Sequence, residues 1–317
     1  MYDVTAIGEL LIDFAALSAD QDGYPTMAAK PGGAPGNYLA ALAAYGAKTA
    51  FLGKVGADAF GKLLKETMKK AGIETKGIIE DDSVFTTLAF VTRDAGGNRS
   101  FSFARKPGAD TCLRFDELDL SLIDQARFFH FGTLSLTGEP SRTAVQRAVA
   151  YARERGRTIT FDPNLRPPLW DDPEEARRQM LWGLIQADIV KISDEEVSVL
   201  WDCGEREGAD RLLREYGVRL AMVTLGPRGC ILRNRNGWAR AGCPPVRTVD
   251  TTGAGDIFGG AAVSRILKLD KRPEDLTVDE LRGIASFASA AASLSTRKMG
   301  GLPSIPPEEE VLRVMQE

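Results

Sequence analysis

The chain has 317 residues, 44% hydrophobic and 26% charged, which is an ordinary composition for a soluble globular protein. Its net charge of -4 argues against nucleic acid as the main partner, because nucleic-acid-binding proteins present a basic surface. No apolar run is long enough to cross a membrane and no signal peptide starts the chain, so we expect a cytoplasmic protein with no membrane partner.

Two residue types narrow the possible chemistry. The four cysteines are scattered without a CxxC pair, which predicts reduced thiols and argues against a zinc site. The single histidine, His130, lies in the apolar run 128–132, and we expect it to be a core residue of a buried strand. A carboxylate is therefore the preferred candidate for any general base.

Strand-like and helical runs alternate for most of the length, which is the pattern of a mostly parallel sheet covered by helices. We therefore expect one α/β domain over residues 1–317. Its first strand, over 4–7, leads to Asp13, which would lie at the carboxyl edge where such sheets bind ligands. A plain turn residue is an equally good interpretation of Asp13 taken alone.

The next distinctive segment, 31–36, is rich in glycine and proline and precedes a helix expected over about 37–45. The pair Gly32 and Gly33 would let a ligand approach the main chain closely, and Asn37 offers both a donor and an acceptor to a polyol. A tight loop with Asn37 as helix N-cap explains the same residues, and from the residues alone we prefer that interpretation.

Two familiar nucleotide-binding motifs can be rejected. Residues 56–63 nearly match the phosphate-binding loop of nucleoside triphosphatases, but Leu63 stands where Ser or Thr should hold the metal. They also lie in a helical pattern over 58–71, which Gly72 ends. A dinucleotide-dependent dehydrogenase would need GxGxxG after the first strand, and 8–12 does not supply it.

The alternation is interrupted twice. Residues 15–30 form a polar segment, and the strand-like runs 85–92 and 99–105 are joined by a turn containing 96–98. We expect these segments, about 15–30 and 84–107, to form a small β-rich lid over the carboxyl edge of the sheet. Arg105, at the end of the second run, could then reach the site.

The alternation then resumes. Strands are expected near 128–134, from 158, over 188–192 and over 219–225, with helices near 141–155, 173–186 and 277–298. Arg166, Glu196 and Gly226 each follow one of these strands, at the edge that binds ligands. Glu196 is also a good helix-dipole partner without any function.

The stretch 250–256 predicts an anion site. Its small residues let backbone N–H groups face outward before an apolar helix begins, and a helix N-terminus attracts anions. Asp256 lies in the first turn of that helix, where it could serve only as a cap or could accept a proton beside a bound phosphate.

Together, and in order along essentially the whole chain, these features resemble the ribokinase-like (PfkB) sugar kinases. The resemblance is carried by GGxxxN at 32–37 and by DTTGAGD at 250–256, of which the second is highly specific. It implies a ribokinase-like three-layer α/β sandwich with a mostly parallel central sheet and a small β-rich lid. In this family such lids often pair two chains, so we expect a homodimer formed through the lid.

The resemblance also implies roles for individual residues. Asp256 resembles the general base, and the anion hole would be formed by the N–H groups of Gly253, Ala254 and Gly255. The sugar would be held by Asp13, Gly32, Gly33 and Asn37, with Arg105 and Arg166 nearby. The nucleotide would contact Lys191, Ser193, Thr224, Gly226 and Gly229. Glu196 would act on magnesium through water, and a potassium site is implied at Asp250 and Thr252.

Within the family, the sequences of segments 8–14, 32–37, 162–170 and 191–196 resemble the fructokinase branch. The implied reaction is the transfer of phosphate from ATP, with Mg²⁺, to O6 of D-fructose. One alternative is a 2-keto-3-deoxygluconate kinase, whose substrate carboxylate Arg105 or Arg166 could bind. Another is a sugar or nucleotide sensor without catalysis, against which the intact 253–256 argues.

Overall fold

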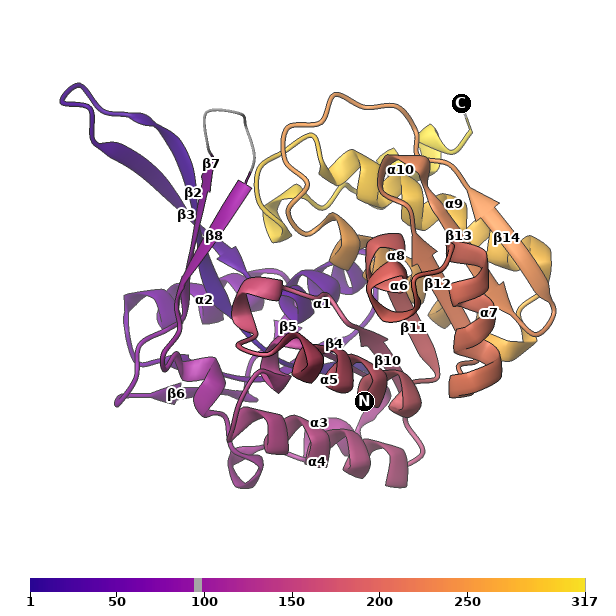
Figure 1. Ribbon diagram of the computed structural model, residues 1–317, viewed down its shortest axis with the longest axis horizontal. Helices are drawn as coiled ribbons and strands as arrows, with labels where there is room; N and C mark the ends of the chain where they lie inside the picture. The colour runs from indigo at the N-terminus through magenta and orange to yellow at the C-terminus, as the bar shows by residue number, and fades with distance from the viewer. Residues whose placement is uncertain (94–98, 317) are drawn as a thin grey trace.

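The computed structural model describes residues 1–93 and 99–316. Its centre is a ten-stranded sheet with the order β14-β13-β12-β11-β10-β9-β1-β4-β5 and with β6 paired to β4 (Figure 1). The strands are β1 (Tyr2–Ile7), β4 (Thr49–Gly56), β5 (Ile73–Glu74), β6 (Ile78–Asp81), β9 (Ala126–Gly132), β10 (Thr158–Asp162), β11 (Ile189–Ser193), β12 (Leu220–Thr224), β13 (Cys230–Asn234) and β14 (Gly237–Ala241). All pairs are parallel except β12–β13 and β13–β14, which confirms the expected mostly parallel sheet.

Helices cover both faces of this sheet and complete the expected three layers. One face carries α1 (Ala34–Ala44), α2 (Ala59–Lys70), α8 (Ala254–Leu269), α9 (Val278–Ser295) and α10 (Glu308–Val314). The other carries α3 (Ser121–Asp124), α4 (Ser141–Glu154), α5 (Pro173–Gln186), α6 (Asp194–Trp201) and α7 (Glu205–Tyr216). Among the described residues, no helix combines the length and apolarity that crossing a membrane requires.

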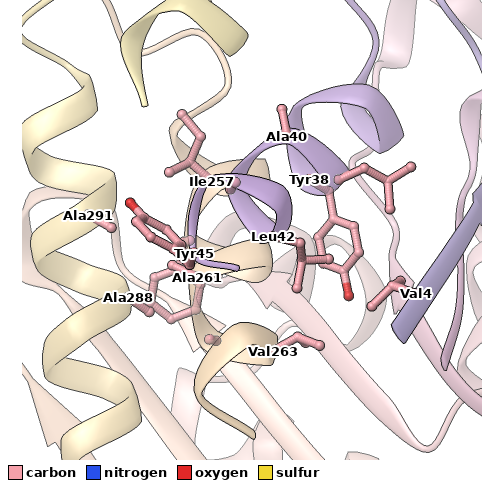
Figure 2. Packing of buried hydrophobic residues seen from close by; sticks show 14 of the residues in the cluster. Val4, Tyr38, Ala40, Leu42, Tyr45, Ile257, Ala261, Val263, Ala288 and Ala291 are labelled. Carbon is pink, nitrogen blue, oxygen red and sulfur yellow. The ribbon is translucent and has the colours of Figure 1, made fainter. Parts of the chain in front are cut away.

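Close packing between α1 and α8 sets the geometry of the site. The contact is made by Tyr38 and Leu42 of α1 and by Tyr45 directly after it, which belong to one buried cluster with Ile257 and Ala261 of α8 (Figure 2). The two helices can approach closely because Gly260 has no side chain. A β-carbon at this position would lie only 2.4 Å from the Tyr38 carbonyl oxygen. The first turns of α1 and α8 are thereby held together, although they are more than 200 residues apart in sequence.

A separate four-stranded sheet stands at one end of the molecule, where the β2–β3 hairpin projects beyond the rest of the chain (Figure 1). Its order is β3-β2-β7-β8, with β2 (Leu11–Ala19), β3 (Pro25–Gly32), β7 (Leu88–Arg93) and β8 (Arg99–Ala104). Aromatic contacts fix this small sheet to α2, since Phe14 stacks on Phe90 with ring centroids 5.3 Å apart and meets Phe60 edge-on at 5.6 Å.

Several element predictions need correction. Asp13 does not end the first strand, because a new strand, β2, begins at Leu11 and carries Asp13 within the small sheet. The strand expected from 85 begins at Leu88, and the turn expected at 96–98 lies outside the described residues. Asn37 is not a helix N-cap, because α1 already begins at Ala34 and its cap is Gly33.

Candidate active site

The centre of the site is a contact between the first turns of α1 and α8. Asn37 Nδ2 donates a hydrogen bond of 2.9 Å to Asp256 Oδ2, and both side chains are buried. The carboxamide oxygen of Asn37 is buried without a hydrogen-bond partner among the described residues. Asn37 therefore orients Asp256 and keeps one acceptor available beside it.

The pKa of Asp256 is raised above the usual value for an aspartate. Burial is the largest influence and raises this pKa, while the hydrogen bond from Asn37 and the positive charges of Lys191 and Arg166 lower it. A carboxylate with a raised pKa is a stronger base than an exposed aspartate.

The N-terminus of α8 has the backbone geometry of an anion site. Gly253 is its N-cap, with φ of 77°, and no side chain caps the helix. The N–H group of Ala254 donates to the Thr251 carbonyl oxygen at 3.2 Å, so it is already engaged within the turn. The other N–H groups of this first turn lack a capping side chain and lie beside Asp256.

Lys191 brings a positive charge to the same turn. A β-carbon on Gly255 would lie 2.9 Å from Lys191 Nζ, so the ammonium lies directly against this turn and a side chain here would displace it. Burial lowers the pKa of Lys191, but the negative charges of Asp162, Glu196 and Asp256 outweigh it, so the net direction is upward. Lys191 therefore remains a cation beside the helix terminus.

Asp13 reaches the site from the small sheet, at the start of β2. Burial raises the pKa of Asp13 to about 7, and the positive charge of Arg166 lowers it. Gly32 and Gly33 let the chain turn from β3 into α1 at this point. A β-carbon on Gly32 would lie 2.3 Å from Asp13 Oδ2, and one on Gly33, whose φ is 114°, 2.4 Å from the Glu9 carbonyl oxygen.

The two predicted arginines are placed differently. Arg166 Nη1 contacts only carbonyl oxygens of its own loop, the closer being that of Leu165 at 3.2 Å, and its charge lowers the pKa values of Asp13 and Asp256. Arg105 is buried and fully engaged, with two nitrogens on Asp110 Oδ2 at 2.9 and 2.7 Å. Its other bonds go to Thr137 and to the Leu134 carbonyl oxygen.

Three of the five predicted nucleotide residues line a cavity of 560 Å³ that adjoins the N-terminus of α8, while Lys191 and Ser193 are not part of its lining. Thr224, Gly226 and Gly229 form one wall, and Ala254 and Gly255 link the cavity to the anion site. Further walls that the sequence did not indicate are Cys243, Pro244, Pro245, Val246, Thr248, Thr251, Phe258, Ser289, Ala292, Ser293 and Thr296. The segment 243–248 shows no periodicity and no glycine motif, so no sequence signal identifies it.

Ser193 and Glu196 form the capping box of α6. Ser193 N–H and Oγ donate to Glu196 Oε2, and Leu165 N–H donates to Glu196 Oε1 at 2.7 Å. Among the described residues no group of three or more acidic, histidine or cysteine side chains could hold a metal ion unaided. Mg²⁺ is usually bound through phosphates and waters, and Glu196 Oε1, which accepts only one hydrogen bond among the described residues, keeps a lone pair for a metal-bound water, so the residue fits that role.

Asp250 and Thr252 form a compact turn before α8. Asp250 Oδ1 accepts from the N–H and hydroxyl of Thr252, and Oδ2 accepts from Gly300 N–H at 2.9 Å. The same two residues, with Asp13, Lys30 and Gly300, line a smaller cavity of 40 Å³ at the base of the small sheet. Asp250 thus ties the loop at 299–300 to the anion site.

The remaining acid of interest, Glu9, was not indicated by the sequence. It is buried, it accepts the N–H of Ala34 at 2.8 Å, and it shares a small cavity with Asp256 and Asn164. His130 lies in the same region, stacked on Tyr38 with centroids 3.8 Å apart, and burial lowers its pKa to about 3. Its neutral, packed state agrees with the expected core position.

Glu9 makes stability depend on pH. Burial raises its pKa to about 7 from an ordinary 4.5, so between these values the folded protein holds a proton that the unfolded chain has lost. The free energy of unfolding should therefore fall as pH rises from about 5 to 8. Urea unfolding at both pH values should show that Glu9→Gln, which keeps the bond to Ala34 N–H, removes up to about 3 kcal/mol of this fall. An equal fall in both proteins would contradict the assignment.

The whole chain is similar to known kinases. The pattern of the pfkB family carbohydrate kinases matches residues 1–308. Fructokinase-1 from Zea mays is 42% identical over 99% of this chain and 97% of its own length. The structure of fructokinase with bound ATP from Xylella fastidiosa superposes with a TM-score of 0.90 at 28% identity, over 100% of this chain and 99% of that one. The structure of a fructokinase double mutant from Vibrio cholerae O395, with fructose, ADP and potassium bound, superposes with a TM-score of 0.88 at 28% identity. The match covers 99% of this chain and 98% of that one. The chain therefore belongs to the pfkB family of carbohydrate kinases.

Proposed function

We propose that this protein is an ATP-dependent fructokinase that phosphorylates D-fructose at O6 to give fructose 6-phosphate. The observation that carries the proposal is the buried Asp256 held by Asn37 beside the uncapped N-terminus of α8. A proton acceptor and an anion site are thus in contact, between a large cavity for a nucleotide and a smaller one beneath the small sheet. The relatives named above act on fructose with the same fold.

The reaction needs alignment more than covalent chemistry. A sugar hydroxyl is a weak nucleophile, and the γ-phosphate repels it electrostatically. Asp256 would accept the hydroxyl proton, while Asn37 holds the carboxylate in position. The first-turn N–H groups of α8 and the ammonium of Lys191 would stabilise charge on the transferred phosphoryl group. Magnesium, bound with ATP, supplies further charge neutralisation, and Glu196 would hold one of its waters.

The two arginines favour a neutral sugar. A 2-keto-3-deoxygluconate kinase needs a free cation for the substrate carboxylate. Arg105 has its guanidinium on Asp110, Thr137 and the Leu134 carbonyl oxygen, so it is not available for that purpose. The charge of Arg166 lowers the pKa values of Asp13 and Asp256, so these two acids already compensate part of it.

A coupled assay of ADP release with a panel of sugars tests the proposal. Fructose should be turned over faster than ribose and 2-keto-3-deoxygluconate, and product analysis should find phosphate on O6. Binding of fructose and ATP without ADP release would instead identify a sensor. Faster turnover of the keto-acid would overturn the choice of substrate.

We also propose that residues 1–317 form a single domain in the cytoplasm, with the small sheet acting as its lid.

We further propose that potassium binds near Asp250 and Thr252. The support for the cation is the position of Asp250, which joins the anion site to Gly300. Replacing potassium by choline in the assay should lower activity if the ion orders this loop. Unchanged activity in choline would remove the potassium proposal.

The lid also supports a homodimer. Leu17, on strand β2, is 58% exposed, although it lies on an apolar strand. If two lids pair, Leu17→Glu should shift the mass measured by light scattering at micromolar concentration from dimer to monomer. Ile185→Glu is the matched control, because Ile185 is 57% exposed on α5, away from the lid. A monomeric native protein would remove this proposal.

A further inference from the structure

A buried ion pair lies beneath the anion site. Asp162 ends strand β10, Lys191 lies on the neighbouring parallel strand β11, and Lys191 Nζ is 3.0 Å from Asp162 Oδ2. Their exposed fractions are only 6% and 7%. The other oxygen of Asp162 accepts the N–H of Asn164 at 3.1 Å. One carboxylate therefore holds both the ammonium and the loop that leads to Arg166.

Three acids act on the ammonium, since the negative charges of Asp162, Glu196 and Asp256 all raise the pKa of Lys191. Burial raises the pKa of Asp256, and the charge of Lys191 is among the influences that lower it, so the two groups interact. The other charged groups that act on Asp256 are Arg166, Asp13 and Asp162 itself. A buried ammonium that lost its partner would be strongly destabilising, so without Asp162 it would move to the nearest remaining carboxylate. The remaining carboxylates that act on it are Glu196 and, less strongly, Asp256. A move toward either would take the ammonium from its place beside Gly255.

We propose that Asp162 is a positioning residue that holds the Lys191 ammonium beside Gly255. The cation then remains at the helix terminus where a phosphoryl group would be transferred. The inference rests on the proposed function, because it assigns Asp256 and Lys191 their parts in phosphoryl transfer. It adds a residue that touches neither the sugar nor the nucleotide.

Asp162→Asn is the direct test, because it removes the charge while its amide oxygen can still accept the Asn164 N–H. We expect kcat with fructose to fall at least about tenfold. The acid limb of the pH profile should also move to lower pH, since the negative charge of Asp162 acts on Asp256 and is lost in the variant. This shift alone does not report on Lys191, so an unchanged kcat in a folded variant is the result that would overturn the proposal.

Asp188→Asn is the matched control. Asp188 precedes the same strand β11 at its opposite end, where it accepts the Ile159 N–H at 2.8 Å and pairs with Arg219. It therefore joins β10 and β11 as Asp162 does, but far from Asp256. This variant should lose stability in a thermal melt while kcat and the acid limb remain those of the native protein.

A double-mutant cycle separates this inference from the proposed function. If Asp162 acts through Lys191, adding Asp162→Asn to Lys191→Met should cause no further loss of kcat. Losses that multiply would overturn the inference. The same cycle, followed by calorimetric binding of a non-hydrolysable ATP analogue with Mg²⁺, needs no turnover, and additive losses of affinity there would also overturn it. A native protein inactive on fructose would overturn only the proposed function.

Discussion

Replacing Asp256 by Asn is expected to lower kcat with fructose by about 10²–10⁴-fold, the usual contribution of a positioned general base. Asparagine has nearly the same shape, and its side-chain oxygen can still accept the hydrogen bond from Asn37 Nδ2. The contact between α1 and α8 should therefore survive, and the proton acceptor alone is lost. Affinity for ATP, measured by calorimetry, should change little, because most of the nucleotide cavity is formed by other residues.

The pH profile of the native protein gives this prediction a second measurement. Since burial raises the pKa of Asp256, the acid limb of kcat should lie above the pH at which an ordinary aspartate titrates, and Asp256→Asn should abolish that limb. A variant with normal turnover, or with a retained acid limb, would show that another group accepts the proton. Asp13, whose pKa burial raises to about 7, would then be the next candidate.

The fold could be predicted largely because its cause is local. The period of apolar residues indicated helices that the structure places within three residues of the expected bounds, and α5 at Pro173–Gln186 coincides with them. The helix start at 253–256 was equally clear, because a glycine cap followed by an apolar run has few other interpretations. The antiparallel hairpin β13–β14 was missed, although Asn236, in its turn, and Gly237, which begins β14, are together a familiar turn signal.

The parts of the site that sequence could not supply depend on tertiary packing. Whether Asp13 ends one strand or begins another is decided by the small sheet, which residues far along the chain complete. The sequence alone predicts that Arg105 is a free cation at the end of a strand. The fold, however, places Asp110 and Thr137 in hydrogen bonds with its guanidinium. The pairing of Lys191 with Asp162 requires two strands to be neighbours, which no local pattern states.

Gly253→Ala is expected to lower kcat by about 10²–10³-fold, because oxyanion-hole geometry tolerates little displacement. Gly253 has a φ of 77°, which an L side chain adopts at a cost of about 1–2 kcal/mol. Its new β-carbon would lie 2.7 Å from the Gly301 Cα and 3.2 Å from Asn37 Nδ2. The variant therefore moves either the first turn of α8 or the amide that orients Asp256, and either movement misaligns the anion site and the base.

Gly46→Ala separates this effect from backbone strain alone. Gly46 follows α1, its φ is 93°, and a β-carbon there would meet nothing within 4 Å. Both variants should lose free energy of unfolding in urea, Gly253→Ala the more because of its contact with Gly301, yet only Gly253→Ala should lose turnover. A Gly253→Ala enzyme that is destabilised but fully active would show that the N-terminus of α8 does not carry the developing charge. Equal losses of kcat in the two variants would mean that strain, and not the shape of the anion site, limits the enzyme. The proposed mechanism requires the first variant alone to fail, because only its glycine lies between the Gly301 backbone and the side chain that holds the base.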